Sequence, residues 1–335
     1  MTFSHHEQTD QPEHRFAEFI RILGKGKKGS RPLTQDEAYQ AMTMILADEV
    51  LPVQLGAFLM LMRVKEETPE ELAGFVHAAQ DASKISVTNT TVDLDWSSYA
   101  GKRRQLPWFL LSALMLAKNG ITVLMHGTKG AGGRLYTEDM LPLLGLEPAR
   151  SAAHAQEQLA TQRFSYLPLQ HFCPKLQEII ELRPILGLRS PVHTLVRLLN
   201  PFHAAYSIQG IFHPGYRPVH QLAAQLLGQP HAAVLKGEGG ETECNPDVDC
   251  LVQSVHRGEL SDEAWPAQFV RRHTRPEQLE PMHLAHVWQG KALDEYGEAS
   301  VIGTAAIALK LLGKAGTQPE ALAMAKEFWL MRLKA

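Results

Sequence analysis

Three cations stand side by side at Lys102, Arg103 and Arg104, in the loop after an expected strand at residues 92–96. An apolar helix is expected to follow over residues 107–118. Loops of this kind often bind anions, because the first helical N–H groups have no partner and the helix dipole is positive there. The long cationic side chains suit an extended phosphate surface better than one small pyrophosphate. A solvated charge run has the same composition, and from the loop alone this alternative is favoured.

Two other glycine-containing stretches carry further cations. Residues 24–29 match GxGxxG, but no strand precedes them, so a dinucleotide site is not expected. Residues 126–134 follow a fully apolar strand expected at 121–125 and lack the GK[ST] ending of a P-loop. For this second loop, a flexible turn and an anion site stay equally open. The cations of the two regions are Lys25, Lys27, Lys28, Arg31, Lys129 and Arg134.

A cluster of carboxylates follows the strand expected at residues 232–235. Its members are Glu238, Glu241, Glu243, Asp247 and Asp249. Carboxylate oxygens are suitable ligands for Mg²⁺. A solvated acidic loop is the more frequent outcome, because acidic side chains are common on protein surfaces. The sequence contains no HExxH or GxSxG motif and no Cys/His set with metal spacing.

The elements that must position these loops divide the chain into two parts. Residues 14–80 are expected to be helical, and Leu51–Met62 is apolar nearly all round, which predicts burial in a core or against a partner subunit. From residue 86, strands alternate with helices, interrupted by helices expected at 174–186 and 191–199. We therefore predict an α/β protein with a larger lobe that carries a mainly parallel sheet flanked by helices. The predicted organisation is a disordered N-terminus (1–13), a small all-helical lobe (14–85 plus about 172–203) and an α/β lobe (86–171 plus 204–335).

Composition limits the classes of function. The net charge of −3 means that a polyanion site must be a local patch. Three cysteines without CxxC spacing fit a reducing cytosol better than a disulfide scaffold. The polar start of the chain does not resemble a signal peptide, and no apolar run is long enough to span a membrane. These features predict a cytoplasmic protein with no membrane partner.

The segment 182–201 contains Arg183-Pro-Ile-Leu-Gly-Leu-Arg-Ser and ends in Leu-Leu-Asn-Pro. It resembles the R-x-x-L-G-x-R-(T/S)…L-x-N-P hinge of the class III nucleoside phosphorylase/phosphoribosyltransferase fold, typified by anthranilate phosphoribosyltransferase. His126-Gly127 resembles the H-G of the K-H-G-N-R loop in the same family. The resemblance covers roughly residues 15–330 and implies a homodimer through the helical lobe. It also implies a ligand pocket that includes Tyr99, Gly101, His126, Gly127 and Arg183, with Arg183 facing the acceptor.

The chain departs from the family pattern at the donor site. The family's G-T-G-G-D loop cradles the pyrophosphate of phosphoribosyl pyrophosphate (PRPP), and here Tyr99–Arg104 stands in its place. The Asp-Glu pair for Mg²⁺ appears as Thr242-Glu243, which leaves Glu243 as the remaining metal ligand. The pattern is closest to the divergent YbiB-like branch, which resembles these transferases while binding nucleic acid.

Two functions follow from this resemblance. The first is sequence-independent binding of DNA and RNA by a homodimer, chiefly through Lys102, Arg103 and Arg104, with the other cations auxiliary. The alternative is a glycosyltransferase or phosphoribosyltransferase, anthranilate phosphoribosyltransferase-like, with altered donor or acceptor. We expect no efficient anthranilate phosphoribosyltransferase activity. No cofactor is expected to be required, and Mg²⁺ is expected only if transferase activity is retained.

Overall fold

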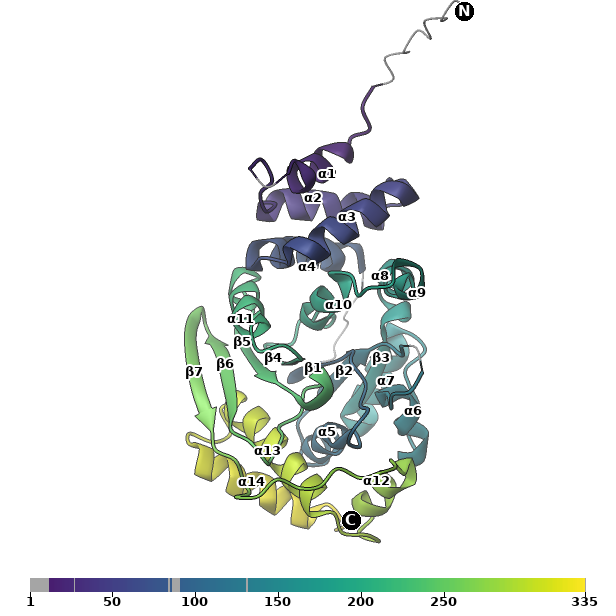
Figure 1. Cartoon of the computed structure of the whole chain (residues 1–335). Coiled ribbons are helices and arrows are strands. Elements are labelled where there is room, and N and C mark those ends of the chain that lie inside the picture. Colours follow the sequence, from purple (N-terminus) through teal and green to yellow (C-terminus); the bar gives the residue numbers. More distant parts are fainter. Residues whose placement is uncertain (1–11, 27, 84, 86–90, 131, 335) are drawn as a thin grey trace, which may run out of the picture.

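The computed structural model describes residues 12–26, 28–83, 85, 91–130 and 132–334. A bundle of helices lies at one end of the molecule and the sheet-containing lobe at the other (Figure 1). The bundle consists of α1 (Ala17–Gly24), α2 (Gln35–Leu46), α3 (Pro52–Lys65) and α4 (Pro69–Ser83). Helix α2 begins with a capping box, in which Thr34 and Glu37 satisfy each other's backbone N–H groups. Helices α2 and α4 pack closely because Gly74 has no side chain: a Cβ there would lie 2.2 Å from the carbonyl oxygen of Gln35.

The larger lobe is built on one mixed sheet. Among the described residues the sheet has seven strands in the order β3-β2-β1-β4-β5-β6-β7. Strands β1 to β5 run parallel, and β6 and β7 are antiparallel additions at one edge. The strands are β1 (Leu94–Ser98), β2 (Val123–Gly127), β3 (Phe164–Pro168), β4 (Tyr206–Ile211), β5 (His231–Lys236), β6 (Cys250–His256) and β7 (Glu259–Trp265).

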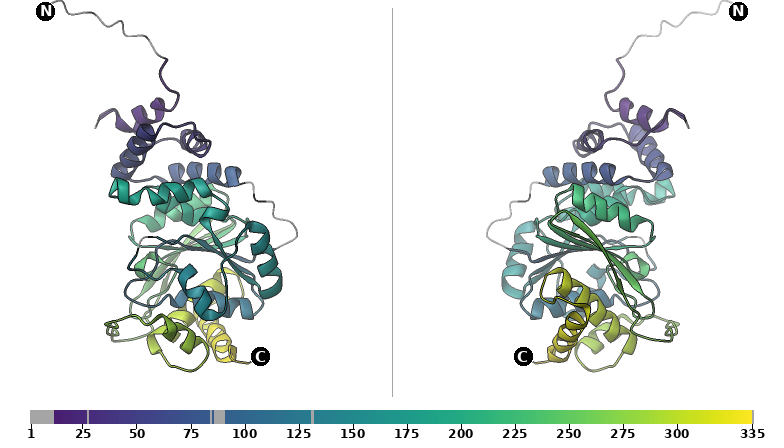
Figure 2. Two further views of the ribbon diagram at one scale, coloured as in Figure 1. Left: turned by 90° about the vertical axis from the view of Figure 1, so that its right-hand side faces the viewer. Right: turned by 90° about the vertical axis from the view of Figure 1, so that its left-hand side faces the viewer.

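Helices cover both faces of this sheet. The α-helices of the lobe are α5 (Trp108–Lys118), α6 (Thr137–Met140), α7 (Ala152–Gln162), α8 (Pro174–Glu181), α9 (Arg183–Leu186), α10 (Val192–Leu195), α11 (Tyr216–Leu226), α12 (Pro281–Trp288), α13 (Glu295–Leu311) and α14 (Gln318–Met331). Short 3₁₀ turns are η1 (Leu141–Leu144), η2 (Leu169–His171), η3 (Val196–Leu198) and η4 (Glu238–Gly240). The views in Figure 2 place the helical bundle and the C-terminal helices at opposite ends of the molecule.

Two apolar cores lie on the two faces of the sheet. Because side chains alternate along a strand, Val123 and Met125 enter the core with α5 and α13, whereas Leu124 enters the other core. This second core continues into the bundle through residues of α2, α3 and α4. Helix α10 packs against α4, and the side chain of Gln80 donates a hydrogen bond to the carbonyl of Leu199 (2.9 Å). The bundle and the α8–α10 region are therefore joined by one core, which lies on one face of the sheet.

The predicted fold class is confirmed, although helix α7 and strand β7 were not predicted. Strand β7 did not show in the sequence pattern because most of its side chains are exposed and polar. It pairs with β6 through a tight turn in which Arg257 and Gly258 both have positive φ. Residues 1–11 of the N-terminus that we expected to be disordered lie outside the described residues. The predicted boundaries between the helical lobe and the α/β lobe stay predictions. Among the described residues, no helix combines the length and apolar composition needed to cross a bilayer.

Candidate ligand-binding site

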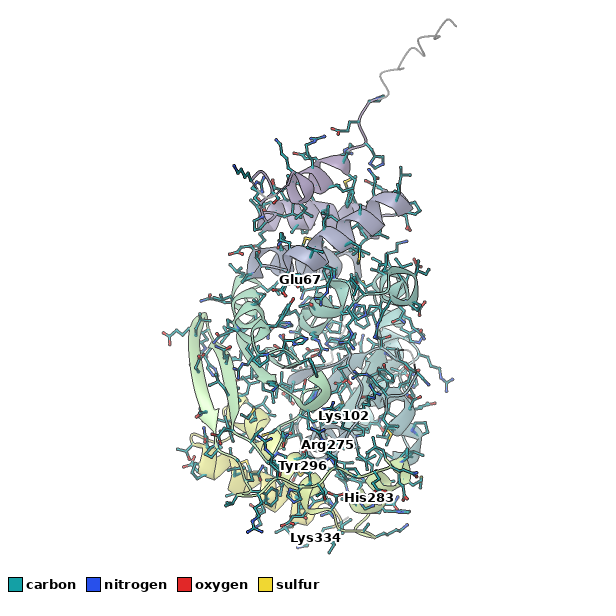
Figure 3. All side chains as sticks on the ribbon, in the orientation of Figure 1. Glu67, Lys102, Arg275, His283, Tyr296 and Lys334 are labelled. Carbon is teal, nitrogen blue, oxygen red and sulfur yellow. The ribbon has the colours of Figure 1, made fainter. Side chains whose placement is uncertain are left out.

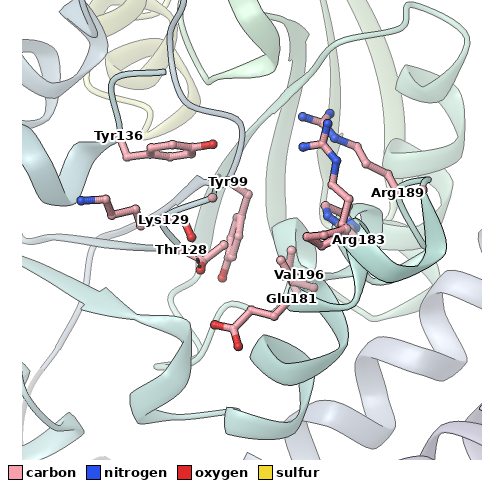
Figure 4. A pocket seen from close by; sticks show the side chains of 13 residues that line it. Tyr99, Thr128, Lys129, Tyr136, Glu181, Arg183, Arg189 and Val196 are labelled. Carbon is pink, nitrogen blue, oxygen red and sulfur yellow. Dashed lines mark hydrogen bonds between the residues drawn. The ribbon is translucent and has the colours of Figure 1, made fainter. Parts of the chain in front are cut away.

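A cavity of about 580 Å³ lies between the carboxyl ends of β1 and β2 and the segment α8–α10 (Figure 4). This edge of a parallel sheet is where α/β proteins usually bind ligands. Of the predicted pocket residues, Tyr99 and Arg183 line it, whereas Gly101, His126 and Gly127 do not. The other lining residues are Thr128, Lys129, Gly130, Tyr136, Ile180, Glu181, Pro184, Gly187, Arg189, His193 and Val196.

Arginine side chains give one wall of this cavity a positive charge. Figure 4 shows the guanidinium groups of Arg183 and Arg189 close together on one side of the cavity. The pKa of Arg189 is lowered, first by burial and then by the charges of Arg183 and Arg134. Burial and the neighbouring Arg189 lower the pKa of His193 to about 4, so this imidazole is neutral at pH 7. Like charges held together in this way favour an anionic ligand.

Aromatic side chains make the opposite wall. Tyr99 Oη lies 2.6 Å from His126 Nδ1, and His126 Nε2 lies 3.3 Å from Asp95 Oδ2. If His126 donates Nε2–H to Asp95, its Nδ1 accepts the hydrogen bond from Tyr99. All three side chains are buried, and burial raises the pKa of Tyr99 well above its usual value. The hydroxyl therefore stays protonated, and the hydrogen-bonded chain fixes the ring at the cavity wall.

The loop between β1 and α5 already holds an anionic group of the chain itself. Glu241 Oε1 accepts hydrogen bonds from the backbone N–H groups of Ala100 (2.6 Å) and Gly101 (2.5 Å). The guanidinium of Arg134 donates to the carbonyl oxygens of the same two residues, at 3.0 and 3.1 Å. The N–H groups that would make this loop an anion site are thus occupied by a carboxylate.

Lys102, predicted as a chief contact to nucleic acid, is wholly buried in the α/β lobe (Figure 3). Its Nζ lies 2.5 Å from Glu243 Oε1 and 2.6 Å from Glu238 Oε2. Glu243 also accepts a hydrogen bond from the backbone N–H of Phe109 (2.9 Å). The predicted role of Lys102 is therefore wrong, because an ammonium sealed between two carboxylates cannot reach a phosphate chain.

Of the other predicted cations, Arg134 is partly buried on the carbonyl oxygens of Ala100 and Gly101, and the rest that the structure describes are on the surface but not gathered in one place. Arg103, Arg104, Lys25 and Lys28 are exposed and form no ion pair within the described residues. Arg31 pairs with Glu37, and Lys129 pairs with Asp139. Lys25, Lys28 and Arg31 belong to the α1–α2 connection in the bundle, at the far end from the α/β loops (Figure 1). Lys27 lies outside the described residues.

The acidic cluster neither forms a solvated loop nor fits a metal site. Glu241 and Glu243 are fully buried and bind the N–H groups and the ammonium described above. Asp247 bonds to His273 (2.7 Å), and Asp249 accepts from the N–H of Ala267 (2.9 Å). Within the described part of the chain, no three His, Cys, Asp or Glu side chains gather as metal ligands. Glu243, expected as a ligand of Mg²⁺, instead binds Lys102, so the residues present do not fit that ion.

The sequence analysis did not single out Arg189 or Arg197 as site residues, and it gave Glu241 a different role. Arg189 carried a signal, because it is the second arginine of the hinge pattern around Arg183. Arg197 is fully buried and donates to the carbonyl oxygens of Gly210 (2.7 Å) and Gly240 (2.9 Å), a role that no local pattern reveals. Glu241 was grouped with possible metal ligands. Its actual partners, the N–H groups of Ala100 and Gly101, lie 141 and 140 positions earlier in the chain, so no local pattern reveals them.

The amino-acid sequence of this chain is similar to those of known proteins. Residues 17–83 match the helical bundle domain of a glycosyl transferase family, and residues 109–330 match its a/b domain. The chain is 30% identical over 237 residues to "Uncharacterized protein YbiB" of Escherichia coli K12, across 69% of this chain and 73% of that protein. It is 27% identical over 318 residues to anthranilate phosphoribosyltransferase of Geobacillus kaustophilus, across 92% of each.

Solved structures share the fold. That of anthranilate phosphoribosyltransferase from Thermus thermophilus superposes with a TM-score of 0.79 at 23% identity, across 96% of this chain and 98% of that one. The enzyme from Saccharomyces cerevisiae in complex with PRPP and Mg superposes with a TM-score of 0.76 at 18% identity, across 95% and 96%. The helical bundle and the sheet-containing lobe therefore both have the fold of these proteins.

Proposed function

The chain belongs to the glycosyl transferase family whose helical bundle and α/β domains it contains, and we propose that it is a phosphoribosyltransferase-like protein with an altered donor site. Its cavity takes a phosphorylated sugar and holds the phosphate with arginine side chains instead of a metal ion. The observation that carries this proposal is the pairing of Arg183 and Arg189 on one wall of the cavity. The loop amides are not available for the same task, because Glu241 occupies them.

The proposed ligand chemistry follows from the two walls. A guanidinium binds phosphate oxygens through two parallel N–H donors, and a pair of guanidinium groups matches a phosphate of high charge. The rings of Tyr99 and Tyr136 offer an apolar surface for the sugar or for an aromatic acceptor. In a transfer reaction, the acceptor would form a bond to the sugar carbon as the bond from that carbon to the phosphate oxygen breaks, and the arginines would neutralise the negative charge that gathers on the leaving phosphate.

A titration with PRPP tests the proposal. The yeast relative was solved with PRPP and Mg, so PRPP is a suitable probe, and the titration is run with EDTA and again with Mg²⁺. We expect similar heats under both conditions. The variant Arg183→Ala/Arg189→Ala should bind at least about tenfold more weakly, because each lost charge-assisted hydrogen bond contributes about 1.5–3 kcal/mol. Arg103→Ala/Arg104→Ala removes the same charge outside the cavity and should bind like the parent protein.

A second candidate function, sequence-independent binding of nucleic acid, rests on the exposure of Arg103 and Arg104. Neither forms an ion pair with the described residues, so both are free to meet phosphates. Fluorescence anisotropy with mixed-sequence oligonucleotides over a range of salt concentrations tests it. For single strands, loss of two phosphate contacts in Arg103→Ala/Arg104→Ala should reduce the slope of log K against log[salt] by about 1.4. Equal affinities and slopes for parent and variant would exclude these arginines from such a site.

A further inference from the structure

Two histidine side chains meet at the amino end of strand β5, away from the cavity at the carboxyl ends of β1 and β2. His231 lies on β5 and His256 on β6, and their Nδ1 atoms are 3.1 Å apart. Two N–H groups cannot point at each other at this distance, so at least one of the two nitrogens carries no proton. We propose that the pair binds a divalent transition-metal ion of the Zn²⁺ class, which displaces the proton between the two nitrogens.

The distance between the two nitrogens suits a single metal ion. Zn²⁺ binds imidazole nitrogen at about 2.0–2.1 Å, so two ligands at the tetrahedral angle lie about 3.3 Å apart. The observed 3.1 Å is close to this value, and a small rotation of either ring makes up the difference. Imidazole is also a ligand type that Zn²⁺, Cu²⁺ and Ni²⁺ prefer.

The backbone holds the two side chains at this distance. His231 and His256 are direct partners in the antiparallel pairing of β5 with β6. In the neighbouring pair, the N–H of Arg257 donates to the carbonyl of Pro230 (2.6 Å). Hydrogen-bonded and non-hydrogen-bonded pairs alternate along such strands, so the histidines form a non-hydrogen-bonded pair, in which opposite side chains are closest. The tight turn at Arg257 and Gly258, both with positive φ, follows at once and fixes the end of β6.

One imidazole is also fixed by an aromatic neighbour. The ring of Tyr206 stacks on that of His231, with centroids 4.4 Å apart and planes at 13°. His231 is half-buried and His256 is exposed, so an ion can reach both from solvent. The described part of the chain places no cluster of three His, Cys, Asp or Glu side chains for a metal ion. Water would therefore fill the remaining coordination positions, which makes this an open, exchangeable site.

A cavity of about 230 Å³ beside His256 has room for this water. Its polar lining includes Ser254, Ser261 and Glu263. Such groups accept hydrogen bonds from metal-bound water and orient it. Lys310 also lines the cavity, but it pairs with Glu263 at 3.2 Å, so the charge that would oppose a cation is partly compensated.

A zinc titration tests the proposal, which goes beyond the proposed function because the cavity arginines take no part in it. ZnCl₂ is titrated by calorimetry into the full chain. Every protein carries His5→Ala/His6→Ala, so that these two adjacent imidazoles do not compete for the ion. We expect one Zn²⁺ per chain at the tightest site. His231→Asn and His256→Asn should each bind it at least about tenfold more weakly, because each removes one of two protein ligands.

Two controls separate a shared site from general binding to histidine. His231→Asn/His256→Asn should bind little more weakly than either single variant, because the two side chains act on one ion. His286→Asn removes an exposed imidazole of α12 and should bind like the parent. The proposal is overturned if the parent binds no Zn²⁺, if either single variant keeps the parent's affinity, or if His286→Asn loses as much.

The melting temperature gives a second readout for variants that are too dilute or unstable for calorimetry. At a hundredfold excess of free Zn²⁺ over its Kd, the parent chain of 335 residues should melt roughly 4 °C higher than in EDTA. At the same Zn²⁺ concentration, His231→Asn and His256→Asn should show a clearly smaller rise. An equal rise in the parent and in both single variants would place the bound ion elsewhere and overturn the proposal.

Discussion

Replacing Lys102 with Ala should destabilise the protein without touching its surface charge. The ammonium is fully buried between Glu243 and Glu238, at 2.5 and 2.6 Å from their oxygens. Burial raises the pKa of the Glu243 carboxyl, and Lys102 opposes this shift. Without the lysine, two carboxylates lose their charged partner, and the pKa of the buried Glu243 rises further, so that the folded state must either hold an unpaired charge or take up a proton.

The magnitude follows from the loss of a buried ion pair, which costs about 3–5 kcal/mol. With an unfolding entropy of about 2.1 cal/mol/K per residue, a chain of 335 residues shifts its Tm by roughly 1.4 °C per kcal/mol. We therefore expect Lys102→Ala to melt roughly 4–7 °C below the parent protein at pH 8. A carboxyl with a raised pKa in the folded state favours the fold at low pH, and this contribution is lost as the pH rises through that pKa. The deficit should therefore shrink toward pH 5.

Differential scanning calorimetry measures this effect, and the chain offers a matched control. Arg103→Ala/Arg104→Ala removes two adjacent exposed cations and should change stability by no more than about 0.5 kcal/mol per residue. The double variant Lys102→Met/Glu243→Gln should recover part of the loss, because it removes both charges of the pair. If Lys102→Ala melts within about 1 °C of the parent, the scatter expected of a surface change, the lysine is not buried as described and the reasoning fails.

Three further predictions concern other parts of the molecule. Burial lowers the pKa of His220 to about 3, so the contribution of this residue to the free energy of unfolding should decline as the pH falls below 6.5, by about 3 kcal/mol at pH 4. Urea unfolding at several pH values measures this decline, which should be smaller in His220→Asn. Val53, 76% exposed on α3, should lie in a dimer interface, so Val53→Asp should halve the mass in sedimentation while the parent stays dimeric. Turnover of PRPP with anthranilate should stay below about 1 s⁻¹, and a faster rate in a coupled assay would contradict the altered donor site.

The alternation of strands and helices could be predicted because local patterns in the amino-acid sequence indicate each element. The apolar run at β2 indicates a strand covered on both faces, and the capping pattern at Thr34 marks the start of α2. Strand β7 escaped because its exposed polar side chains give no such period.

The site was harder to predict because its decisive contacts join distant parts of the chain. Lys102 looks like Arg103 and Arg104 in the sequence, and only the fold brings it against Glu243, 141 positions later. The same applies to Glu241, whose carboxylate meets the amides of a loop far earlier in the chain. The hinge arginine Arg183 was found because its surrounding motif is local, and Arg189 belongs to the same motif.

A crystal structure of the protein soaked with PRPP and Mg²⁺ tests the central claim most directly. We expect electron density for the phosphates between Arg183 and Arg189, with the carboxylate of Glu241 still on the N–H groups of Ala100 and Gly101. Density in that loop, with Glu241 displaced and a metal ion on the acidic segment, would contradict the account.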